Sequence, residues 1–142
     1  MLCTALQIRP DDIAVNPYNH LLYKSSYLSV IPVCYAIYRQ NLGYSFTICS
    51  VLCTSLLYWK KPTRGLRRNI DMIVVNSVFV YHSYKAIGTK YARKHYLWNG
   101  MGILCYGLSW FFQFKNHLLA ANIMHMLLHI FANVSNIYLI SG

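Results

Sequence analysis

Five blocks of mostly apolar residues, separated by short basic loops, constrain this chain more than any other feature of its sequence. The blocks cover residues 20–38, 44–59, 71–87, 97–114 and 118–140. About 20 apolar residues cross the hydrocarbon core of a bilayer as a helix, and the last block reaches that length without a charged residue. The pattern predicts an all-α, polytopic membrane protein with about five transmembrane helices. Four helices are the alternative, because the apolar run that begins at Asp71 ends early, at Lys85.

The scarcity of charge favours the same class of protein. Charged residues make up 11% of the 142 residues, whereas soluble domains carry about 25%. The sequence has no Glu, and its three acidic residues are Asp11, Asp12 and Asp71. Tyr and Trp gather near the block ends, as at Tyr58 and Trp59, where the headgroup level of a bilayer favours them. An aromatic-rich soluble core is the alternative, and the charge count argues against it.

The domain organisation is simple. Residues 1–142 are expected to form a single helical membrane domain, preceded by a polar arm over residues 1–19. Pro10 and Pro17 oppose regular structure in that arm, and it lacks the basic and apolar regions of a removable signal. We therefore expect an integral membrane protein. An organellar inner membrane, a thylakoid membrane and an endomembrane all fit the pattern.

Two basic clusters flank the block at 71–87. The first is predicted to bind anionic lipid headgroups or an acidic partner surface, and it contains Lys60, Lys61, Arg64, Arg67 and Arg68. The second cluster lies within residues 85–94, on the opposite face under a five-helix topology. Either the block at 71–87 does not cross, or a partner or anionic lipid holds one cluster. Other membrane subunits are expected partners, whereas nucleic acid is not expected.

Polar residues in the last block repeat with helical spacing. They are Asn122, His125, His129, Asn133 and Asn136. Steps of three and four residues put them on one stripe of a helix. A polar stripe in lipid is unfavourable unless it faces protein or a cavity. We expect a helix–helix seam there, in which each His bonds to an adjacent helix, although two His at this spacing can also share one metal ion.

Ser55, Asp71 and the pair His125–His129 resemble the motif of the CREST superfamily, the group of alkaline ceramidases and progestin/adiponectin-type receptors. The resemblance implies a membrane hydrolase or a relative of one, typically with seven helices. It further implies a zinc ion bound by three His, with Ser55 and Asp71 as catalytic residues in amide hydrolysis.

The chain also departs from that pattern. The first motif His would fall at position 59, where this sequence has Trp59. His117 is the possible stand-in as a metal ligand, and His82 lies too far beyond Asp71 to serve. For Asp71 the alternative role is stabilisation of a helix start, with Arg67 or Arg68 nearby.

Three functions follow, and the first is favoured. The chain is expected to be a small non-catalytic accessory or structural subunit of a larger membrane complex, without a cofactor. The second is a reduced CREST-like, zinc-dependent lipid-amide hydrolase. The third is a pigment- or haem-binding subunit of a photosynthetic or respiratory complex, holding chlorophyll or haem, because His is a common ligand in membranes. We expect a polar seam without a metal and no hydrolase activity.

Overall fold

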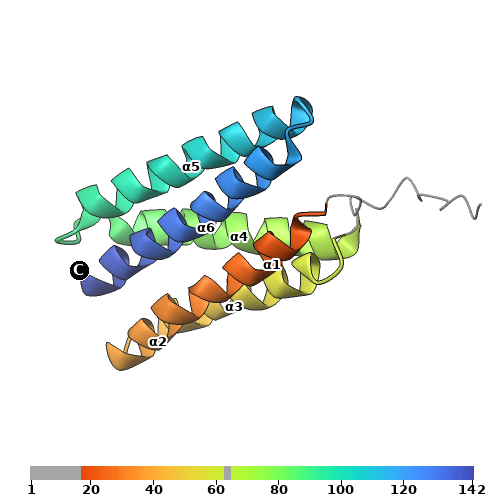
Figure 1. The fold of residues 1–142 in the computed structure, drawn as a ribbon. Helices are drawn as coiled ribbons and strands as arrows, with labels where there is room; N and C mark the ends of the chain where they lie inside the picture. Colours follow the sequence, from red (N-terminus) through yellow and green to blue (C-terminus); the bar gives the residue numbers. More distant parts are fainter. Residues whose placement is uncertain (1–16, 63–64) are drawn as a thin grey trace, which may run out of the picture.

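The computed structural model describes residues 17–62 and 65–142, and these residues form helices connected by short turns (Figure 1). The helices are α1 (Asn19–Ser26), α2 (Val30–Tyr38), α3 (Leu42–Trp59), α4 (Leu66–Ala86), α5 (Ala92–Phe114) and α6 (Leu118–Ser141). A 3-10 turn, Tyr27–Ser29, joins α1 to α2, so the two form one rod. The expected all-helical fold is confirmed for the described residues. Most of the expected polar arm, residues 1–16, lies outside them.

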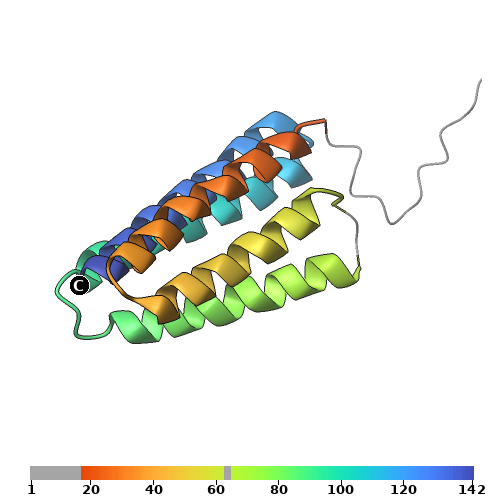
Figure 2. The same cartoon turned by 90° about the horizontal axis from the view of Figure 1, so that it is seen from below.

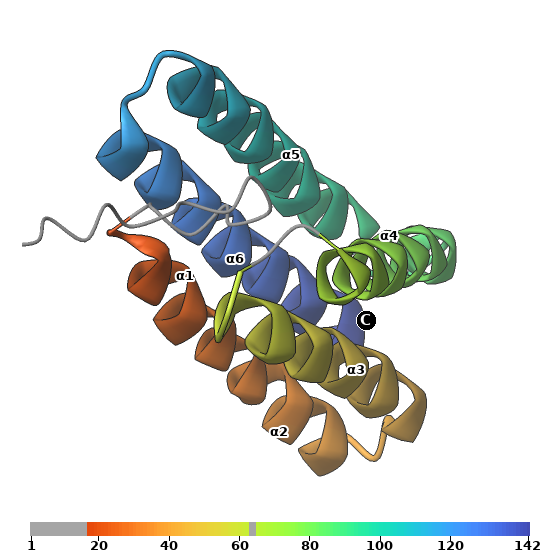
Figure 3. The same ribbon diagram turned by 90° about the vertical axis from the view of Figure 1, so that its right-hand side faces the viewer.

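The α1–α2 rod and helices α3, α4, α5 and α6 run alternately up and down the bundle in sequence order. The C-terminus lies at the opposite end of the bundle from the connection between α3 and α4 (Figures 1 and 2). Seen along the bundle, α6 occupies the middle, with α5 on one side and the α1–α2 rod and α3 on the other (Figure 3). Helix α4 packs mainly against α3 and stands apart from α5. The side of the bundle between α4 and α5 is therefore the least closed.

Two helices, α3 and α6, are long and apolar enough to cross a membrane. Five such spans were expected. Helices α4 and α5 carry polar and charged side chains, among them Arg67, Asn76 and Lys94, and α1 and α2 have only 8 and 9 residues. The ends of α3 and α6 agree with the expected blocks to within a few residues.

Helices α4 and α5 each begin five residues before the expected position. In α4, Gly65 precedes the helix with φ of +145°, a backbone geometry suited to glycine. Arg67 and Arg68 then continue the helix, since Arg is a good helix former although it is not apolar. Asp71 is consequently not in the first turn. The expectation that Asp71 starts a helix and stabilises its N-terminus is wrong.

The α5–α6 pair is the tightest contact in the bundle. Gly102 permits it, because a Cβ at that position would lie 3.3 Å from Leu128 Cδ1. Ser135 and His95, both fully buried, close the same interface. The Ser135 hydroxyl lies 2.8 Å from His95 Nδ1 and 3.0 Å from the His95 carbonyl oxygen. This pairing holds α6 in register with α5.

Candidate functional site

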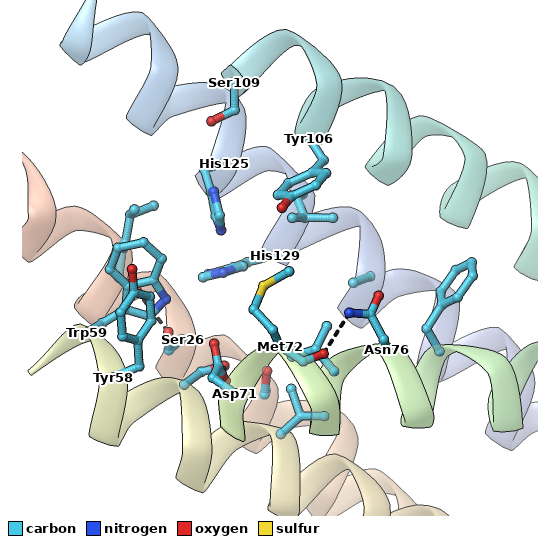
Figure 4. A pocket seen from close by; sticks show the side chains of 18 of the residues that line it. Ser26, Tyr58, Trp59, Asp71, Met72, Asn76, Tyr106, Ser109, His125 and His129 are labelled. Carbon is cyan, nitrogen blue, oxygen red and sulfur yellow. Dashed lines mark hydrogen bonds between the residues drawn. The ribbon is translucent and has the colours of Figure 1, made fainter. Parts of the chain in front are cut away.

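A cavity of about 700 Å³ lies between α4 and α5, with α6 at its back and α1 and α3 along its side (Figure 4). Its volume is within the range of about 300–1,000 Å³ found for small-molecule sites. Every helix except α2 contributes to its wall. The cavity forms because α3 and α6 hold α4 at one edge, while no tight contact draws α4 onto α5.

The polar stripe of α6 faces this cavity along its whole length. The five residues that line it are Asn122, His125, His129, Asn133 and Asn136. Helical periodicity is the cause, because steps of three and four residues return to the same side of α6. The stripe thus borders open space over much of its length.

His125 and His129 lie edge to face, with their ring centroids 5.2 Å apart. His129 Nδ1 is 2.7 Å from the Ser25 hydroxyl of α1. That hydroxyl also lies 3.1 Å from the Leu22 carbonyl oxygen. Its single proton serves one of these two partners, so His129 Nδ1 either accepts from Ser25 or donates to it, according to its tautomer. The contact ties α6 to α1 in both cases.

Asp71 and Ser55 meet at the wall formed by α3 and α4. Asp71 Oδ1 accepts hydrogen bonds from Ser55 Oγ at 2.8 Å and from Thr54 Oγ1 at 2.9 Å. Asp71 is 7% exposed and is the only acidic side chain among the described residues. A hydroxyl that donates to a carboxylate is a usual arrangement for activating oxygen. It is equally a stable tie between two helices.

The structure brings four of the motif residues to one cavity, since Ser55, Asp71, His125 and His129 all line it. His117 is placed elsewhere: it is the N-cap of α6, and its ring lies against Phe112 at 6.5 Å. It is not among the residues that line the cavity.

Trp59 stands at the sequence position where the CREST motif has its first His. Its ring meets His125 edge to face at 5.3 Å. Two imidazoles on one tetrahedral zinc have ring centroids about 5 Å apart, so the His pair fits such an ion. The indole of Trp59 has no lone pair to offer. Among the described residues, no group of three or more His, Cys, Asp or Glu is placed to hold a metal ion. The donor set therefore does not fit the three-His zinc site.

His82 and His95 are buried histidines outside the polar stripe of α6. His82 Nδ1 donates to Asn136 Oδ1 at 2.9 Å, and its Nε2 lies 2.8 Å from the Thr47 hydroxyl. His82 thereby joins α3, α4 and α6. His82 lies about three helical turns after Asp71, so both residues are on one face of α4. That spacing is the sequence signal that could have identified His82 as facing the same interior as Asp71. His95 pairs with Ser135, a residue outside the polar stripe.

The first basic cluster divides between the surface and the cavity. Lys60, Lys61 and Arg67 are exposed, whereas Arg68 is half-buried and lines the cavity. No described residue forms a hydrogen bond or an ion pair with Arg68. Arg64 lies outside the described residues. Among the described residues of this cluster, only Arg68 lines the cavity.

Comparisons with known proteins returned no match to a family model, a curated protein or a solved structure. The resemblance to the CREST superfamily accordingly depends on the motif residues alone.

Proposed function

We propose that the chain is an integral membrane protein whose five helical rods all span the bilayer. The length of the rods supports this, since α4 and α5 have 21 and 23 residues and thus extend about 31–35 Å, close to the thickness of a hydrocarbon core. Their outer faces support it too. Ile73, Val80 and Leu104 are each more than 60% exposed, and soluble monomers seldom display large apolar patches.

Within the membrane, the cavity binds an amphiphilic, membrane-soluble molecule. The two charged residues of the cavity lining, Arg68 and Asp71, both lie near the α3–α4 connection, and this is the observation that supports the role. Near the α3–α4 connection the lining is polar, with Asn19, Arg68, Gln113 and Asn122. Further along the bundle the lining carries no charged residue: Ile48, Phe79, Ile103 and Leu128 are apolar, and Asn76, Asn133 and Asn136 are polar but neutral. A polar head against Arg68 and an apolar tail along α4 and α5 satisfy both ends.

The bound molecule is held and not hydrolysed. Trp59 is the single observation that carries this conclusion, because it stands at the sequence position of the first motif His with a side chain that cannot ligate. A small, non-catalytic, lipid-binding subunit of a membrane assembly is the function that fits. The net charge of +10 favours assembly with anionic lipid or an acidic subunit.

A zinc-dependent lipid-amide hydrolase is the second candidate. The hydrogen bond between Ser55 and Asp71, in the same cavity as the two His, favours it. In that function Ser55 and Asp71 would orient and deprotonate the attacking oxygen. That function would also need a third zinc ligand, because His125 and His129 supply only two.

Metal content and turnover separate the two candidates. The full chain, purified in detergent and exposed to zinc, is measured by elemental analysis and then given a fluorescent long-chain amide. We expect far less than one zinc per chain, no cleavage, and recovery of the intact amphiphile with the protein. One zinc per chain, together with cleavage that Ser55→Ala abolishes and Ser50→Ala does not, would make the hydrolase correct and the binding role wrong.

A further inference from the structure

A cluster of lysine and tyrosine side chains lies at the end of the bundle opposite the polar end of the cavity. It consists of Lys90, Tyr91, Lys94 and Tyr138, and we call it the lysine–tyrosine cluster. The residues come from the α4–α5 connection, the first turn of α5 and the last turns of α6. None of them lines the cavity described above. The cluster is therefore a separate surface.

The two ammonium groups are held by aromatic rings. Lys90 Nζ lies 5.2 Å from the Tyr91 ring centroid, and Lys94 Nζ lies 5.6 Å from the same centroid. Lys94 Nζ also lies 5.2 Å from the Tyr138 ring. These distances are within the range of cation–π attraction. The rings thus position two long side chains that are otherwise free to move apart.

The end of α6 fixes this arrangement. The Tyr91 and Tyr138 ring centroids are 6.1 Å apart, so α6 supplies one of the two rings. At Gly142 an added Cβ would lie 3.2 Å from Thr89 Cβ and 3.4 Å from the Lys90 amide nitrogen. The last turn of α6 therefore rests directly on the α4–α5 connection. The cluster has a defined shape rather than a diffuse charge.

No described side chain balances the positive charge of the cluster. Asp71 is the only acidic side chain among the described residues, and it is hydrogen-bonded to Ser55 and Thr54. Asp71 lies fifteen residues before the end of α4, or about 22 Å along the helix. Lys90 and Lys94 also repel each other, and Lys85 and Arg93 add charge nearby. An anion bound between the two ammonium groups would remove this repulsion.

The surroundings of the cluster select a membrane lipid as the source of that anion. Large apolar side chains next to it are exposed, with Ile87 at 69% and Leu97 at 61%. Tyr84 and Tyr96 are exposed as well, and the Tyr96 hydroxyl donates to the Ser83 carbonyl oxygen at 2.7 Å. Cations directly beside exposed apolar and Tyr side chains are typical of the headgroup level of a bilayer.

We infer that the lysine–tyrosine cluster binds the phosphate headgroup of an anionic membrane lipid, and this inference rests on the proposed integral membrane location. The phosphate oxygens accept from Lys90 and Lys94 while the acyl chains lie along Ile87 and Leu97. A lipid bound there also resolves the conflict between two basic clusters at opposite ends of α4. Each end is neutralised by its own leaflet, so α4 can cross.

The test uses the full chain in nanodiscs of phosphatidylcholine, with or without phosphatidic acid or phosphatidylglycerol, and counts retained lipids by native mass spectrometry. We expect retention of the anionic lipids over phosphatidylcholine. Lys90→Gln and Lys94→Gln should each weaken retention about fivefold, as one basic contact near an anionic leaflet predicts.

Two control variants test the cluster itself. Arg39→Gln removes an exposed cation at the same end of the bundle and should leave retention unchanged. Tyr138→Phe keeps the ring and should behave as the parent, whereas Tyr138→Leu should weaken retention about as much as Lys94→Gln. If Arg39→Gln matches Lys90→Gln, or if Tyr138→Leu has no effect, the binding is diffuse and the inference is wrong.

Alkaline extraction of the membranes separates this inference from the proposed function. A chain released by carbonate is not integral, and both proposals then fail. A chain that stays in the membrane but shows no anionic preference overturns only the lipid site. Salt-sensitive binding of an acidic protein at Lys90 and Lys94, without lipid preference, would also overturn it.

Discussion

The α5–α6 interface and the cavity beside α4 use the same kinds of residue in opposite ways. At the interface, His95 and Ser135 pair with each other in full burial. At the cavity, His125 and His129 face an open volume of about 700 Å³. Buried polar groups that satisfy one another lock two helices together. Polar groups that face a cavity remain able to bond to a bound molecule, so the difference separates structural His residues from candidate ligand-binding ones.

The largest effect is expected from a substitution in the α5–α6 interface, which is the closed side of α6. Ser135→Leu adds bulk to a tight interface and removes the hydroxyl that bonds to His95 Nδ1 and to the His95 carbonyl oxygen. His95 Nδ1 keeps the Ser135 backbone carbonyl oxygen as a partner, so the loss comes from overpacking and from the missing interhelical hydrogen bond of the hydroxyl. Together these should lower the free energy of unfolding by about 2–4 kcal/mol. Unfolding in mixed detergent–SDS micelles, followed by circular dichroism, measures the change.

Ser50→Leu is the matched control for this substitution. Ser50 is half-buried, and its hydroxyl donates only to the Phe46 carbonyl oxygen of its own helix. The control should change the free energy of unfolding by less than about 1 kcal/mol, as is usual for sites without special features. Equal losses for the two variants would mean that the α5–α6 interface is no tighter than the rest of the bundle.

The open side of α6 is the face that lines the cavity. Much of it could be predicted from the sequence, because it depends on helical periodicity. The spacing of Asn122, His125 and His129 places them on one face whatever the neighbouring helices do. The apolar runs likewise mark α3 and α6 to within a few residues. Arg67 and Arg68 hide the true start of α4, since a hydropathy pattern does not register charged helix formers.

The closed side could not be predicted, because it depends on how helices rotate against one another. His95 and Ser135 are forty residues apart, and no periodicity links them. The same holds for the contact of His82 with Thr47 and Asn136. The cavity volume is also invisible in the sequence, since it depends on the distance between α4 and α5 rather than on the pattern of either helix.

A substitution of intermediate expected effect at Trp59 tests whether the cavity is a ligand-binding site or a metal site. Trp59→His places an imidazole beside His125, whose ring is now 5.3 Å from the indole. Three imidazoles facing one point form a zinc site. Zinc at about 100 times its dissociation constant should then stabilise the variant by about 2.7 kcal/mol, with no effect on the parent chain. Thermal unfolding with and without zinc measures this.

Two further variants decide how to interpret that result. Trp59→Phe should show no response to zinc, because phenylalanine offers no ligand. Trp59→His combined with His129→Ala should lose the response, because one ligand is then missing. A Trp59→His variant that ignores zinc would show that the three rings do not converge on one point. The resemblance to the CREST motif would then have no geometric content.

The smallest expected effect concerns Ser25→Ala, at the open side. This substitution removes the hydrogen bond between Ser25 and His129 Nδ1 but leaves the imidazole bordering the cavity, where water or a bound head group can replace the hydroxyl. Interhelical hydrogen bonds in membranes contribute about 0.6 kcal/mol on average, so the free energy of unfolding should fall by about that amount.

Ser26→Ala is the matched control, because the adjacent Ser26 lines the cavity yet donates only to the Leu22 carbonyl oxygen of its own helix. The control should leave both stability and the imidazole nitrogen chemical shifts of His129 unchanged, whereas Ser25→Ala should shift the Nδ1 resonance. A loss well above about 2 kcal/mol for Ser25→Ala would mean that His129 is locked as tightly as His95 is, and the contrast between the two sides of α6 would disappear.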